Sequence, residues 1–247
     1  MINFAYLDEI KNLLHIIERE EKDSMEKAVM MLADGIVDKK SIFVFGASHA
    51  GILSEEMYYR AGGLVLINPI FGREMMLDTS PITHTSRMER LEGYGETLMK
   101  KVPIGAGDIL IVHSVSGRNC VSIEVAMEAK KRGAKVIALT NVAYSKSVTS
   151  RHSSGERLFE VCDLVLDNHG EPGDACVSIE GLEQKVSPTS TVIGAAMLNS
   201  IVAAAVQEMV ERGMKNPPIF YSANQDGGDE LNQKIYSAYK DRIHYEY

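Results

Sequence analysis

Two short segments of the chain combine small residues with side chains that can donate hydrogen bonds. The first loop, GASHAG, covers residues 46–51, and the second loop, HSVSGRN, covers residues 113–119. Each follows an apolar run and precedes a helical pattern. Turns of this kind bring the backbone close to a ligand, often a phosphate, because the first N–H groups of the following helix have no partner within that helix. Both loops are therefore candidate ligand-binding turns.

The second loop carries the richer set of donors. Ser114, Ser116 and Asn119 supply polar side chains, and Gly117 allows a close backbone approach. Together with the free N–H groups of the next helix, this set suits a dianionic phosphate. The alternative is a capped turn that binds no ligand. We prefer the phosphate hypothesis because the first loop offers a second wall for the same site.

The elements that must position these loops alternate along the chain. Short apolar runs predict strands, and the stretches at 52–61, 87–101 and 121–132 predict helices between most of them. This alternation indicates a three-layer α/β fold with a doubly wound, five-stranded parallel sheet in the order 2-1-3-4-5. In that order, the loops after the first and third strands face one crevice. The predicted strands cover residues 41–45, 64–68, 109–113, 135–139 and 163–167.

The two ends of the chain are predicted to be helical. Residues 1–38 show two apolar stripes separated by charges, which predicts one long helix or a bent pair that packs on the domain or on a partner subunit. Helices are also expected at 190–212 and 229–240. We predict one domain, with a core at 39–212 and a C-terminal loop and helix at 213–247.

Composition excludes several classes of protein. The net charge of −8 argues against binding to nucleic acid, which requires a basic face. The three cysteines form no zinc or disulfide pattern, and the N-terminus carries acids where a secretory signal carries bases. The longest apolar stretch contains Asn199 and Ser200 and is expected to be too short to span a bilayer. We therefore expect a soluble cytoplasmic protein without a metal or cofactor.

The first loop also fits the dinucleotide-binding pattern GxGxxG, but only loosely. Sites for NAD require an acidic residue near the end of the second strand, and this chain has Asn68 there. A Walker-type phosphate loop is excluded because GK[ST] does not occur. An NAD-dependent enzyme is thus disfavoured.

The paired loops resemble those of the sugar isomerase (SIS) phosphosugar-binding domain. The similarity covers roughly residues 35–212, and it is strongest at 107–141, GDILIVHSVSGRNCVSIEVAMEAKKRGAKVIALTN. The chain also resembles an uncharacterised SIS branch labelled phosphoheptose isomerase, at 179–196 and 217–233. The resemblance implies a sugar phosphate bound by Ser114, Ser116, Gly117 and Asn119, together with Gly46 and Ser48 of the first loop. This chain departs from the family pattern at Ser48, Ala50 and Asn119.

The resemblance implies an aldose–ketose isomerase, which needs a base and an acid to move protons between adjacent carbons. Related isomerases use Glu and His. The candidates here are His49 within the first loop and either Glu55 or Glu56 on the following helix, although each could be an ordinary surface or structural residue. The alternative function is a non-catalytic module that senses a phosphosugar and regulates a partner.

Two further residues are candidate ligand contacts. Thr191 follows Ser190, whose hydroxyl is predicted to cap the penultimate helix, and Asn224 lies in the polar stretch SANQDGGDELNQ. The apolar surface of the N-terminal helix and of residues 192–206 exceeds what one sheet needs. A homodimer or tetramer is therefore expected.

Overall fold

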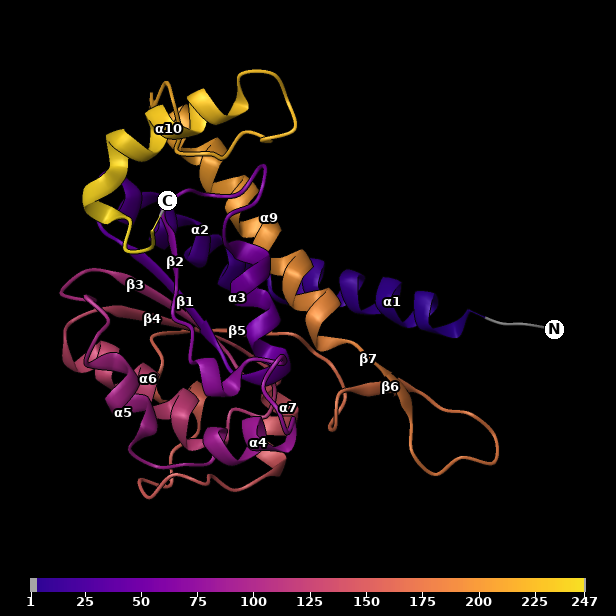
Figure 1. Cartoon of the computed structure of the whole chain (residues 1–247). Helices are drawn as coiled ribbons and strands as arrows, with labels where there is room; N and C mark the ends of the chain where they lie inside the picture. Colours follow the sequence, from indigo (N-terminus) through magenta and orange to yellow (C-terminus); the bar gives the residue numbers. More distant parts are fainter. Residues whose placement is uncertain (1–3, 247) are drawn as a thin grey trace.

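The computed structural model describes residues 4–246. A five-stranded sheet with the order β2-β1-β3-β4-β5 forms its centre, and every neighbouring pair is parallel (Figure 1). This confirms the predicted fold class and strand order. The strands are β1 (Ile42–Gly46), β2 (Ile67–Pro69), β3 (Ile109–His113), β4 (Lys135–Thr140) and β5 (Leu164–Asp167).

Alternating residues of the strands divide the interior into two hydrophobic cores. Ile42 and Val44 of β1 face one core, and Phe43 and Phe45 face the other. The first core includes residues of α1 (Ala5–Glu20), α2 (Lys22–Val37), α3 (Ile52–Met57) and α9 (Ser190–Glu211), and the second includes residues of α5 (Tyr94–Met99), α6 (Cys120–Lys131) and α8 (Leu158–Val161). Helices thus cover both faces of the sheet, as expected for strands that read as continuous apolar runs.

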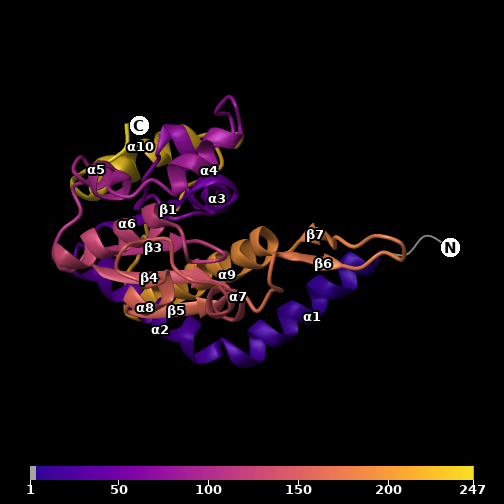
Figure 2. The same ribbon diagram turned by 90° about the horizontal axis from the view of Figure 1, so that it is seen from below.

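The N-terminal segment is a bent pair of helices that meet at Glu21. The buried Glu21 carboxylate lies 3.0 Å from Nε2 of His169 and accepts a hydrogen bond from the backbone N–H of Asp167. These contacts fix the bend to the end of β5. Beyond the bend, α1 projects from the body beside a small hairpin, as Figures 1 and 2 show.

That hairpin, β6 (Ala175–Val177) with β7 (Val186–Pro188), was not predicted from the sequence. It follows β5 and leads directly into α9. The hydroxyl of Tyr6 on α1 donates to the Pro188 carbonyl at 2.7 Å. The hairpin and α1 therefore support one another outside the main body.

Three elements differ from the prediction by more than one residue at an end. The helix predicted at 52–61 ends at Met57, and the one predicted at 87–101 is two helices, α4 (Thr83–Glu89) and α5, separated by Gly93 in the left-handed conformation. Strand β2 begins at Ile67, three residues later than predicted. The backbone N–H of Val65 donates to the Pro218 carbonyl and not to β1. The remaining helices of the described residues are α7 (Val142–Ser147), α10 (Gly228–Tyr239) and the 3-10 turns at Ser48–Gly51, Arg73–Met75 and Lys240–Arg242.

The apolar stretch that contains Asn199 and Ser200 was expected to be too short to span a bilayer, and helix α9 corrects this expectation. Among the described residues it is the one helix that is long and apolar enough, by length and composition alone, to cross a membrane. Its buried residues, which include Ile193, Met197 and Ile201, belong to the first core with α2 and α3. Burial in that core accounts for the apolar residues on one face of α9, and 44% of its most apolar stretch is buried.

Candidate functional site

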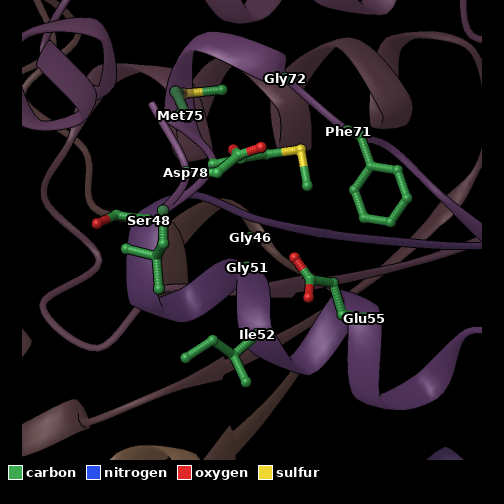
Figure 3. A pocket seen from close by; sticks show the side chains of 11 residues that line it. Gly46, Ser48, Gly51, Ile52, Glu55, Phe71, Gly72, Met75 and Asp78 are labelled. Atoms are coloured by element: carbon green, nitrogen blue, oxygen red, sulfur yellow. The ribbon is translucent and has the colours of Figure 1, made fainter. Parts of the chain in front are cut away.

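The first and second loops lie side by side at the carboxyl ends of β1 and β3 and line an open cavity of about 240 Å³, which we call the first cavity. Ser48 also lines a second cavity of about 310 Å³, formed by the first loop, the start of α3 and residues 71–78 (Figure 3). The first cavity is lined by Ala47, Ser48, His49, Ala50, Glu89, Ser114, Val115, Ser116, Asn119, Ser122, Tyr144, Gly173 and Asp174. The topology therefore brings together the two segments singled out in the sequence.

The first loop is held by its own backbone and by the third strand. A Cβ atom on Gly46 would lie 2.3 Å from the carbonyl oxygen of Ala50, so the turn requires glycine there. Ser48 adopts a left-handed conformation with φ of 55°. The buried ring of His113, at the end of β3, places Nδ1 3.0 Å from the same Ala50 carbonyl. Since a carbonyl only accepts, Nδ1 carries the proton, and burial lowers the pKa of His113.

The second loop is fixed against β4 and the residues that follow it. The hydroxyl of Thr140 donates to the Ser114 carbonyl at 2.7 Å. Gly117 has a φ of 59°, and a Cβ there would lie 2.9 Å from Oγ of Ser145 and 3.3 Å from Cβ of Leu158. Glycine is therefore required at position 117 by packing against the protein, and Gly117 does not line the first cavity.

Asn119 immediately precedes α6 and links two charged side chains. Its Nδ2 donates to Oε2 of Glu89 at 2.6 Å, and its Oδ1 accepts from Nη1 of Arg151 at 2.7 Å. One N–H of the Asn119 amide thus remains for a ligand. Burial raises the pKa of Glu89, and the hydrogen bond from Asn119 partly opposes this. Sequence reasoning missed Glu89, since nothing in the pattern of residues 87–101 distinguishes it from a surface acid.

The candidate acid and base residues occupy different places. His49 lines the first cavity, while Glu55 lines the second cavity, where Figure 3 shows its carboxylate pointing into the space next to Phe71. Glu56 points elsewhere: it pairs with Arg60, which lies just beyond the end of α3, and accepts from Nδ2 of Asn199 at 2.9 Å. The structure thus places Glu55, and not Glu56, on a cavity wall.

The remaining candidates lie outside both cavities. Thr191 sits one residue inside α9 and Asn224 lies exposed in the loop before α10, and neither lines either cavity. The predicted capping by Ser190 is wrong. The cap is the carboxylate of Asp174, which accepts from the backbone N–H of Thr189 and Ser190 at 3.1 and 2.8 Å and from the Ser190 hydroxyl at 2.6 Å.

The fold and the paired loops define an α/β protein with a ligand crevice at the carboxyl ends of its parallel strands. The family model of the SIS domain matches residues 5–141, more than half of the chain. The chain belongs to the SIS domain family. It is 52% identical to UPF0309 proteins of Shouchella clausii and Oceanobacillus iheyensis, and each alignment covers 97% of both chains.

Solved structures share the fold at low sequence identity. A phosphoheptose isomerase from Francisella tularensis is 13% identical with a TM-score of 0.52, and the match covers 82% of this chain and 95% of that one. Phosphoheptose isomerase GmhA from Neisseria gonorrhoeae is 17% identical with a TM-score of 0.51, over 84% of this chain and 96% of that one. These similarities support the layered sheet described above.

Proposed function

We propose that the chain binds a phosphorylated sugar in the crevice formed by its first and second loops and interconverts aldose and ketose forms of that sugar. One observation carries the proposal. The two loops that sequence similarity associates with phosphosugar binding converge on a single polar cavity, lined by Ser48, Ser114, Ser116 and Asn119. The solved proteins named phosphoheptose isomerase share the fold that brings these loops together.

The phosphate is proposed to bind beside the start of α6. Asn119 makes no side-chain cap there, so the first N–H groups of this twelve-residue helix can serve an anion. The hydroxyls of Ser114 and Ser116 line the same wall. Asp174 also lines the cavity, but its carboxylate is bound to the start of α9. Local donors can therefore hold a phosphate in a protein with a net charge of −8.

The sugar is proposed to extend from the phosphate past Ser48 into the second cavity, because Ser48 lines both. There Glu55 would act as the base that removes the proton from C2 of the aldose and returns it to C1. His49 would transfer a proton between the two sugar oxygens. This reaction moves only protons, so the proposal includes no metal or redox cofactor.

The test begins with a thermal-shift screen of phosphorylated sugars, followed by exchange of C1 and C2 protons in deuterated water. We expect Glu55→Gln to lower exchange by roughly two to four orders of magnitude while phosphosugar binding persists. The matched control is Glu56→Gln, which changes the neighbouring acid that faces Arg60 and Asn199. Equal loss in both variants would contradict the role of Glu55.

A non-catalytic phosphosugar sensor is the second candidate function. It is favoured by the separation of His49 and Glu55, which line different cavities on either side of Ser48. Tight phosphosugar binding without any exchange at C1 or C2, across the whole panel, would support the sensor and contradict the isomerase.

We also propose that the chain forms a dimer or tetramer. Phe4, just before the projecting helix α1, and Leu7 on it are exposed, with 71% and 55% of their surfaces accessible, and Leu14 of α1 is also exposed. Exposed apolar surface of this kind is usually covered by a partner. Sedimentation at micromolar concentration tests this, and a monomer would refute it.

A further inference from the structure

We propose that Glu89 is a ligand of the phosphate group and that it acts in its neutral form, so that binding of a sugar phosphate takes up one proton at this carboxyl. The proton comes from solvent, and the resulting O–H donates to a phosphate oxygen. This inference rests on the proposed phosphosugar binding and adds a residue to that site. Above about pH 7, where a phosphate ester is already a dianion, the affinity should therefore fall as the pH rises.

The geometry of Asn119 brings Glu89 and the phosphate together. Glu89 lines the first cavity with Ser114, Ser116 and Asn119. The Asn119 amide has a fixed orientation, because its Oδ1 accepts from the guanidinium of Arg151 at 2.7 Å, and a guanidinium group can only donate. Its Nδ2 therefore faces Glu89, 2.6 Å from Oε2, and the second N–H of the same nitrogen is left for the ligand.

A shared amide nitrogen also sets the separation of its two acceptors. The two N–H bonds of a planar amide group diverge, and with hydrogen bonds of about 2.9 Å their acceptor oxygens lie about 5 Å apart. A carboxylate and a phosphate dianion repel each other at that distance, and a partly buried site weakens this repulsion less than water does.

The second oxygen of the carboxyl group is available to remove this repulsion. Among residues 4–246, Oε2 of Glu89 accepts from Asn119, whereas Oε1 has no hydrogen-bond partner. A proton on Oε1 cancels the charge of the carboxylate and turns this oxygen into a donor towards a second oxygen of the phosphate. Glu89 then binds the phosphate while it keeps its contact with Asn119.

The charges around Glu89 favour a proton once the phosphate is present. Burial raises the pKa of Glu89 and so favours its neutral form, while the hydrogen bond from Asn119 and the charges of Arg90 and Arg151 partly oppose that shift. A phosphate in the same cavity adds negative charge, which raises the pKa of Glu89 further. The complex therefore holds a proton at a pH where the unliganded protein does not.

Other titratable side chains line the same cavity, namely His49, Tyr144 and Asp174. The Asp174 carboxylate already accepts from donors at the start of α9. An imidazole also gains a proton beside a phosphate, so His49 is the alternative source of proton uptake. Uptake by His49 would persist when Glu89 is replaced, and a Glu89 variant therefore separates the two sources.

Titration calorimetry in buffers of different ionisation enthalpy counts the protons that accompany binding. The probes are glucose 6-phosphate, fructose 6-phosphate and ribose 5-phosphate, at about pH 8, well above the second pKa of about 6 of a phosphate ester. We expect the wild-type protein to take up at least about half a proton for each ligand bound, and Glu89→Gln to take up almost none.

The affinity of the same variant gives a second readout. The glutamine side chain of Glu89→Gln can still accept from Asn119 and offers an uncharged donor to the phosphate. We expect it to bind about tenfold more tightly than the wild-type protein at pH 8, and this difference should shrink at pH 6. The control is Glu96→Gln, which changes an exposed acid of α5 and should match the wild-type protein. The melting temperature of each variant verifies that it folds.

Three results would overturn this inference alone. They are binding without proton uptake in the wild-type protein, uptake that survives in Glu89→Gln, and weaker binding of that variant at both pH values, which a purely structural role would produce. If none of the probes and no other sugar phosphate of the screen binds, the proposed function falls as well.

Discussion

Replacing Asp174 should disrupt the junction between the hairpin and helix α9. Its carboxylate accepts four hydrogen bonds at 2.6 to 3.4 Å from Thr189 and Ser190, at the start of a helix of 22 residues. Thr189 and Ser190, which donate to this carboxylate, are both buried. In Asp174→Ala the backbone N–H and the hydroxyl of Ser190 lose their partner, while the N–H of Thr189 keeps the backbone carbonyl of residue 174, at 3.2 Å.

The expected loss follows from two contributions. Removal of a helix-capping side chain costs about 0.5–2 kcal/mol. Leaving the buried hydroxyl of Ser190 unpaired costs about 1–3 kcal/mol. Together these predict that the free energy of unfolding falls by about 1.5–5 kcal/mol in Asp174→Ala. Asp174→Asn should lose less, because the amide oxygen can still accept from the backbone N–H groups.

Urea unfolding followed by circular dichroism measures both variants. A change below about 0.5 kcal/mol for Asp174→Ala, which is within the range of ordinary surface substitutions, would refute the capping role. Asp174→Asn has a second expected effect. It removes a negative charge from the wall of the first cavity, so a bound sugar phosphate should gain affinity.

Three further predictions test the loops and the interior. Since burial lowers the pKa of His113, the unfolded chain takes up a proton at higher pH than the folded chain, and the free energy of unfolding should fall as pH drops below about 6.5. His113→Asn should make this decline less steep. The part that remains is due to His244, because burial also lowers the pKa of that residue. An unchanged dependence of stability on pH would contradict the prediction. Gly46→Ala should yield little folded protein, since its Cβ would lie 2.3 Å from a backbone oxygen; a normal melting temperature would show that the turn relaxes. Burial raises the pKa of Cys162 to about 12, so this thiol should alkylate far more slowly than free cysteine at pH 8, and rapid labelling seen by mass spectrometry would contradict its burial.

The sheet could be predicted from sequence because its strands are buried on both faces and read as continuous apolar runs. Strand β3 lies at the predicted residues 109–113, and β1 begins one residue later than predicted. Strand β2 was harder, since its start depends on Val65 pairing with Pro218, a residue more than 150 positions away. The hairpin β6–β7 likewise depends on contacts with α1 that no local pattern signals.

The candidate site could be predicted only where topology alone brings residues together. The strand order places Ser48 beside Ser114 and Ser116 whatever the details of the loops. Glu89 and Asp174 reach the same cavity from segments whose positions depend on tertiary packing. The direction of a helical side chain is similarly hidden, which is why Glu55 and Glu56 could not be separated from sequence.

The central claim is that the second loop anchors the phosphate of a sugar phosphate, and one comparison tests it most directly. Titration calorimetry would measure the affinity of the best ligand from the screen for the wild-type protein, for Ser116→Ala and for Ser237→Ala, an exposed serine of α10 that serves as control. A hydrogen bond to a charged phosphate contributes about 1.5–3 kcal/mol, so Ser116→Ala should bind at least about tenfold more weakly while the control is unchanged. Equal affinity in all three proteins would contradict the claim.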